Sequence, residues 1–175
     1  MESLATAILD QTATAIAYAE GLVKDVTPQM FARKPEGKKG IIDTNHPAFC
    51  FGHLAIYPAR ICQLAGIENH GITAPEGYEE LFAAGKECRD DPDGKLYPAK
   101  DEIMSAYIDG FKAAIAKIGG LSDAHLAAHH GLDSDFGKRF NSRAAIVNFM
   151  VGPHNFMHIG QISAWRRCMG LGSVF

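Results

Sequence analysis

The stretch Arg143–Met169, RAAIVNFMVGPHNFMHIGQISAWRRCM, decides the fold because it is the longest and most apolar helical pattern in the chain. Asn141 or Ser142 offers an N-cap oxygen, and Met169-Gly170 offers an end. On a helical wheel one line runs through Val147, Val151, His154, His158, Ile162, Trp165 and Met169. We therefore predict a long helix with this stripe facing the core.

Three other segments repeat apolar residues every three or four positions, and they are residues 3–24, 45–66 and 98–120. The connections 26–44 and 69–97 are rich in glycine, proline or aspartate, although residues 78–84 suit a short helix and 122–126 a turn. No segment shows convincing strand alternation. The sequence predicts an all-α fold, a four-helix bundle of non-simple topology, in one domain over residues 1–175.

Composition narrows the classes of partner. The chain has 175 residues, 47% hydrophobic and 21% charged, with a formal net charge of -3 and dispersed basic residues, so we expect no nucleic-acid partner. No run approaches the roughly 18 apolar residues of a membrane span, and Met1–Leu4 lacks a basic leader, so we expect a cytoplasmic protein without a membrane partner. Four cysteines without a CxxC pair indicate reduced, structural thiols: Cys50, Cys62, Cys88 and Cys168.

His154 and His158 form an HxxxH pair, whose side chains project from one helix face with Cβ atoms about 5–6 Å apart. Because the surrounding stripe is apolar, both imidazoles should be buried, and each keeps an acceptor nitrogen that needs a partner. One divalent metal ion can satisfy both nitrogens, and so can hydrogen-bond donors. Helix spacing alone therefore permits a metal site without requiring one.

His53 lies in the other strongly apolar segment with a histidine, Phe49–Ile56, FCFGHLAI. Its spacing fits a core histidine at least as well as a metal ligand. His46 shares the same helix face seven residues earlier and could substitute as a ligand, but its place beside the cap predicts solvent exposure. We expect the loop histidines to lie at the surface, and they are His125, His129 and His130.

Other residues near these histidines have both functional and ordinary interpretations. Pro58 and Pro153 could kink their helices beside a metal, or serve packing only. Polar neighbours could orient a ligand or simply pack, and they are Tyr57, Asn155 and Gln161. Arginines that could bind an anion, or only serve helix ends and the surface, are Arg60, Arg166 and Arg167.

Three stretches, Gly52-His53-Leu54-Ala55, Pro153–Ile162 and Trp165-Arg166-Arg167, resemble the DinB/YfiT-like superfamily, which is distinct from the similarly named DNA polymerase. The resemblance implies a down-up-up-down four-helix bundle, frequently a homodimer. It also implies one metal ion held by a histidine of the second helix and two of the fourth, which match His53, His154 and His158. Members of the family include thiol-dependent S-transferases and a maleylpyruvate isomerase.

Three protein ligands would leave an open position on the ion, where water or a low-molecular-weight thiol can be activated. The motifs of competing metal sites, HExxH and paired ExxH, are absent from the sequence. We expect a metal-dependent enzyme, an S-transferase or hydrolase acting on a small molecule, with Zn or Ni favoured over Fe or Mn. The alternatives are a non-catalytic metal-binding dimer and a metal-free bundle that binds a small apolar ligand.

Overall fold

The structure is a computed structural model that describes residues 3–174. Phe175 lies outside the described residues. So do Met1 and Glu2, on which part of the prediction for the N-terminus rests. The fold is mostly helical, as predicted. The helices are α1 Leu4–Val23, α2 Pro28–Phe31, α3 Pro47–Ala55, α4 Pro58–Leu64, α5 Tyr78–Phe82, α6 Lys100–Ile118, α7 Asp123–Ala127, the 3-10 turn η1 Gly137–Arg139, α8 Arg143–Val151 and α9 Pro153–Cys168.

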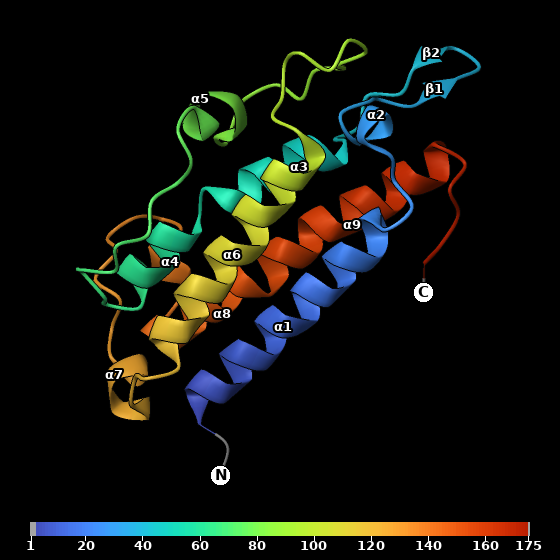
Figure 1. The fold of residues 1–175 in the computed structure, drawn as a ribbon. Coiled ribbons are helices and arrows are strands. Elements are labelled where there is room, and N and C mark those ends of the chain that lie inside the picture. The colour runs from blue at the N-terminus through green and yellow to red at the C-terminus, as the bar shows by residue number, and fades with distance from the viewer. Residues whose placement is uncertain (1–2, 175) are drawn as a thin grey trace.

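The long helices lie side by side (Figure 1). α1 and the α8–α9 pair run in one direction, while the α3–α4 pair and α6 run in the other. α3 packs against α6 and α9, and α4 packs against α6 and α8. The core between them is formed by large buried side chains, including Phe51, Tyr107, Phe111, Ile162 and Trp165. Among the described residues, no helix is long and apolar enough to cross a membrane.

The connection 26–44 is less irregular than predicted. It contains α2, which Thr27 caps, and a two-stranded antiparallel pair, β1 Glu36–Gly37 and β2 Gly40–Ile41. In α1, the apolar repeat of the sequence includes Tyr18 and so predicts a core-facing side chain, but Tyr18 is 38% exposed and packs against Phe156 at the edge of the helix. The apolar periodicity places the face of α1 correctly and misplaces its border.

The two helices that carry histidines are each broken once, where the sequence predicted continuous helices with a possible kink. α3 ends before Tyr57 and α8 ends before Gly152, and Pro58 and Pro153 then occupy the first turns of α4 and α9. Proline has no N–H for the preceding turn, so the helical ladder stops there. At the second break the Asn155 side-chain amide donates to the carbonyl oxygen of Met150 (3.0 Å). Asn155 therefore stabilises the break.

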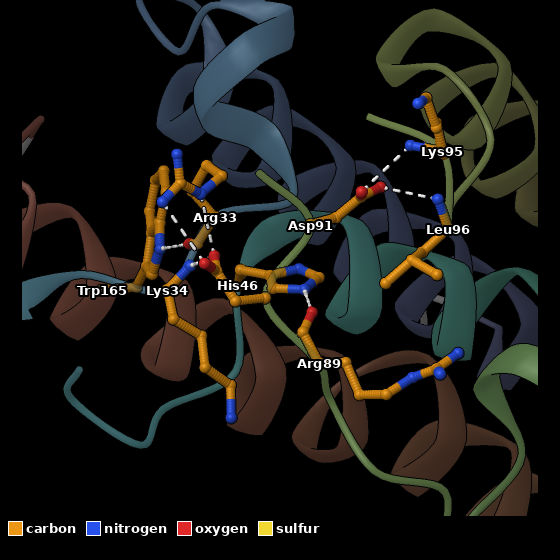
Figure 2. A network of polar contacts seen from close by, with 9 residues as sticks. Arg33, Lys34, His46, Arg89, Asp91, Lys95, Leu96 and Trp165 are labelled. Atoms are coloured by element: carbon orange, nitrogen blue, oxygen red, sulfur yellow. Dashed lines mark hydrogen bonds and ion pairs between the residues drawn. The ribbon is translucent and has the colours of Figure 1, made fainter. Parts of the chain in front are cut away.

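His46 is buried, with 0% exposure, so the prediction of solvent exposure is wrong. Its Nδ1 accepts from the backbone N–H of Phe49 (3.2 Å), which makes the imidazole the N-cap of α3. Its Nε2–H then donates to the carbonyl oxygen of Arg89 (2.9 Å), as Figure 2 shows. The connection before α6 covers the ring, and sequence spacing carries no signal for that cover.

Neighbouring contacts anchor the same end of the molecule (Figure 2). Asp90 accepts from Arg33 Nε (2.9 Å) and from the backbone N–H of Lys34 (2.7 Å). Trp165 of α9 donates its indole N–H to the carbonyl oxygen of Arg33 (2.7 Å). Asp91 accepts backbone N–H groups of the following turn. The two long connections are thereby tied to the start of α3 and the end of α9.

Replacing His46 by alanine is expected to lower the free energy of unfolding by about 1–2 kcal/mol, because loss of a helix cap alone costs about 0.5–2 kcal/mol. Urea unfolding at pH 7 measures this change. Metal binding should be unaffected, because both ring nitrogens of His46 are already hydrogen-bonded. A loss of metal affinity equal to that of a ligand variant would contradict this assignment.

Burial lowers the pKa of His46 to about 4, against a hydrogen bond to the Arg89 carbonyl and the charge of Asp90, which raise it. The unfolded chain therefore binds more protons than the native one between about pH 6.5 and pH 4. The free energy of unfolding consequently decreases as the pH falls through that window. His46→Asn keeps a cap acceptor and removes the titration. Its unfolding free energy should depend less steeply on pH there, measured for both metal-free proteins.

Candidate metal centre

The structure brings together the three histidines that the sequence singled out. His53 lies on α3, and His154 and His158 lie one turn apart at the start of α9. Their ring centroids are 5.5 Å (53–154), 4.8 Å (53–158) and 5.0 Å (154–158) apart. One ligand nitrogen from each lies within 4.8 Å of the others, and the side chains are buried. These three histidines could hold a metal ion.

A backbone carbonyl orients the His53 imidazole. Its Nδ1–H donates to the carbonyl oxygen of Phe82 at the end of α5 (2.7 Å), which leaves the Nε2 lone pair for the cluster. α5 comes this close because residue 52 is glycine: a Cβ there would lie 2.5 Å from Cζ of Phe82. Gly52, part of the sequence pattern around His53, thus has a steric role.

Gln161 orients His158. The Oε1 atom of Gln161 accepts from His158 Nδ1–H (3.1 Å). It also accepts from the side-chain amide of Asn45 (3.2 Å) and from the thiol of Cys50 (3.5 Å). Cys50 of α3 and His158 of α9 therefore both hold the Gln161 amide in place. With Nδ1 engaged, His158 Nε2 is a lone-pair acceptor. Of the predicted orienting residues, Gln161 contacts a candidate ligand through a hydrogen bond.

Two buried ring nitrogens have no hydrogen-bond partner among the described residues: His154 Nδ1 and His158 Nε2. The His154 ring lies between aromatic neighbours, with ring centroids 4.8 Å from Tyr57 and 6.4 Å from Phe149. Leaving buried polar atoms unpaired costs free energy, which a metal ion bound to the same nitrogens would remove. The donor set therefore fits a divalent ion with imidazole ligands.

The electrostatics of the cluster favour neutral imidazoles. Burial, and then the charges of the other cluster histidines, lower the pKa of His154 to about 3 and that of His158 to about 4. Burial also lowers the pKa of His53. At neutral pH the rings keep the lone pairs that a metal requires. No carboxylate belongs to this group, so the charge of a bound divalent ion would remain unbalanced by its protein ligands.

The other histidines do not join the cluster in the part of the chain that the structure describes. His129 is exposed, as predicted. His125 and His130 are half-buried, so the expectation of surface positions holds only in part for them, since their Nε2 atoms contact carbonyl oxygens of Ala65 (2.7 Å) and Phe140 (3.0 Å). These contacts secure the 121–142 segment.

The three candidate arginines occupy different environments. Arg166 is buried and donates to Asp25 and to the carbonyl oxygen of Leu22 (2.6 Å), so it joins α9 to the end of α1. Arg167 is exposed near the end of α9. Arg60 is exposed on α4 and borders the space beside His154. Of the cysteines, Cys168 is exposed, the others are buried, and all are free.

A hollow of about 290 Å³ adjoins the cluster on the His154 side, and its lining residues are Tyr57, Arg60, Phe136, Phe149, Met150 and His154. Both helix breaks border it, since Tyr57 is the N-cap of α4 and His154 lies in the first turn of α9. The sequence reasoning missed Phe136, Phe149 and Met150. In the sequence, Phe149 and Met150 look like ordinary residues of an apolar helix. Phe136 comes from a loop, and no local sequence signal predicts the path of that loop.

No family model matches the chain, and neither a curated protein nor a solved structure matches it.

Proposed function

We propose that this protein is a metal-dependent enzyme whose single divalent ion, Zn or Ni in preference to Fe or Mn, is held by His53, His154 and His158. The observation that carries the proposal is the convergence of three neutral imidazoles, two with buried nitrogens that have no partner among the described residues. An ion with three protein ligands supplies an open position that activates water or a low-molecular-weight thiol. The reaction class is S-transfer or hydrolysis on a small molecule.

We further propose that the chain is a DinB/YfiT-like four-helix bundle of down-up-up-down type, and that it forms a homodimer. The directions of the long helices support this topology, with α1 and α8–α9 opposed to α3–α4 and α6 (Figure 1). The positions of His53 on α3 and of His154 and His158 on α9 support the family's ligand pattern. Analytical ultracentrifugation tests the dimer, and a sedimenting monomer at micromolar concentration would refute it.

In the proposed enzyme the protein's own residues bind and orient. Phe82 and Gln161 hold protons on the Nδ1 atoms of His53 and His158, so that both Nε2 lone pairs face the cluster. Tyr57 covers the cluster, with its ring centroid 5.0 Å from that of His53. Phe149 adds an apolar wall beside His154. These residues keep the rings fixed and limit the access of water.

Metal analysis of protein purified without a histidine tag tests the proposal directly. We expect about one equivalent of metal per chain, or binding of one added Zn²⁺ or Ni²⁺ after chelation. Sub-stoichiometric metal that added Zn²⁺ or Ni²⁺ does not restore would refute it. A metal-free bundle that binds an apolar ligand would then be the better description.

The rival function is metal binding for stability alone. The folded state of the metal-free protein distinguishes it from the proposed enzyme. An enzyme site on a self-sufficient core should keep its helical circular dichroism at 25 °C after chelation, and lose only the stability that ligand binding adds. A structural ion would leave the chelated chain unfolded or molten. The extensive buried core between α1, α6 and the broken helices supports the first outcome.

Cobalt substitution tests whether a thiol can reach the ion. Addition of a small thiol such as 2-mercaptoethanol to the Co²⁺ protein should produce a sulfur-to-cobalt charge-transfer band in the near ultraviolet. Addition of the matched alcohol, ethylene glycol, should not. An unchanged spectrum with both compounds would exclude the thiol and leave water as the activated group.

A further inference from the structure

The 290 Å³ hollow beside His154 combines an apolar lining with one cation. Its walls are aromatic or apolar, and Phe136 and Phe149 contact each other there with ring centroids 5.5 Å apart. Phe149 lies nearly parallel to the His154 ring, at an interplanar angle of 11°. A planar apolar group of modest size would fit such walls.

Arg60 is the charged member of this lining. No acidic side chain of residues 3–174 lies within ion-pair distance of it. A guanidinium with no acidic partner among the described residues, beside an apolar cavity, is suited to bind a carboxylate through paired hydrogen bonds.

Two larger hollows lack this combination. The hollow of about 350 Å³ between α2 and α6 contains Asp91 and Lys100, but backbone groups already engage both side chains. The hollow of about 490 Å³ that shares Tyr57 and Arg60 with this one includes Glu79, whose charge opposes an anion. Neither borders a histidine of the cluster.

We propose that the hollow binds a small carboxylic acid with a planar apolar body, its ring against the wall formed by Phe136 and Phe149 and its carboxylate on Arg60. The proposal rests on the proposed function in treating the hollow as the substrate side of the ion. It names the substrate class: a monocyclic aromatic or similarly compact apolar acid. Binding of the acid depends only on protein side chains, so the metal-free protein can test it.

Phenylacetate is the probe, with phenylacetamide as its neutral isostere and acetate as the acid without a ring. Binding is followed in the metal-free protein through the methyl signals of ¹³C-labelled methionine. Phenylacetate should perturb the Met150 signal and give nuclear Overhauser contacts to Phe136 and Phe149. Phenylacetamide and acetate should each bind at least roughly tenfold more weakly, because each lacks one of the two contacts.

Arg60→Gln should reduce phenylacetate affinity roughly tenfold or more and leave phenylacetamide affinity unchanged, because a hydrogen bond to a charged partner is lost. Arg167→Gln, the same change at an exposed arginine of α9, should alter neither. Equal binding of acid and amide would overturn the proposal, as would an unaffected Arg60→Gln protein, contacts outside the hollow, or no phenylacetate binding. Loss of metal binding with acid binding intact would refute only the proposed function.

Discussion

Replacing His158 by alanine is expected to reduce the affinity for Zn²⁺ by more than 100-fold, and His53→Ala and His154→Ala should do the same. Each change leaves two imidazoles, and the cluster contains no carboxylate or thiolate to take the vacant place. The loss should exceed the roughly 10–100-fold that follows removal of a group hydrogen-bonded to a ligand. Competition with a chromogenic chelator, on protein without a tag, measures it.

Two variants calibrate this prediction. Gln161→Leu removes the acceptor for His158 Nδ1–H and should cost roughly 10–100-fold in Zn²⁺ affinity, less than loss of a ligand. His129→Ala removes an exposed histidine and should cost nothing. Stoichiometric, undiminished binding in any of the three single-ligand variants would show that the ion is held differently.

Gly52→Ala is expected to lower the free energy of unfolding by about 2–3 kcal/mol, although alanine is the better helix former. The added Cβ would meet the Phe82 ring at 2.5–2.6 Å. That ring is fully buried against Phe49, Tyr78 and Tyr97, so it has little room to move. Urea unfolding of the metal-free protein measures this effect.

The same substitution should weaken Zn²⁺ binding roughly tenfold, because displacing Phe82 moves the carbonyl oxygen that orients His53. Gly160→Ala is the matched control, since a Cβ there meets nothing within 4 Å on an exposed face of α9. It should stabilise the protein by about 0.5–1 kcal/mol through helix propensity alone. If Gly52→Ala behaved like Gly160→Ala, the steric role of Gly52 would be wrong.

The starts of the first and last long helical segments and the proximity of His154 to His158 were predictable from the sequence. Ser142, one of the two cap candidates before the last helical segment, is confirmed, and Ser3 caps α1 in the same way, since each offers a short side-chain oxygen before an apolar periodic run. The presence of His154 and His158 on one face follows from helix spacing. His53 could be added only through family resemblance, because one histidine on an apolar face has no spacing partner.

The burial of His46 and the helix breaks were less predictable. A residue at a helix start is usually exposed, but the connection carrying Arg89 closes over His46 from 43 positions away. Pro58 and Pro153 indicated kinks or mere packing equally well, and the chain instead ends one helix and begins another at each. Contacts between segments far apart in sequence decide such outcomes, and local patterns do not encode them.

The HxxxH spacing on an apolar stripe determined by itself that His154 and His158 would be buried neighbours, since a helix repeats every 3.6 residues. Only the tertiary structure decided that His53 joins them and that Phe82 and Gln161 hold its ring and that of His158. It also decided that Arg60 borders the adjoining hollow. The physical reason is that these contacts join separate helices, so they exist only once the core has packed α3, α5, α8 and α9 together.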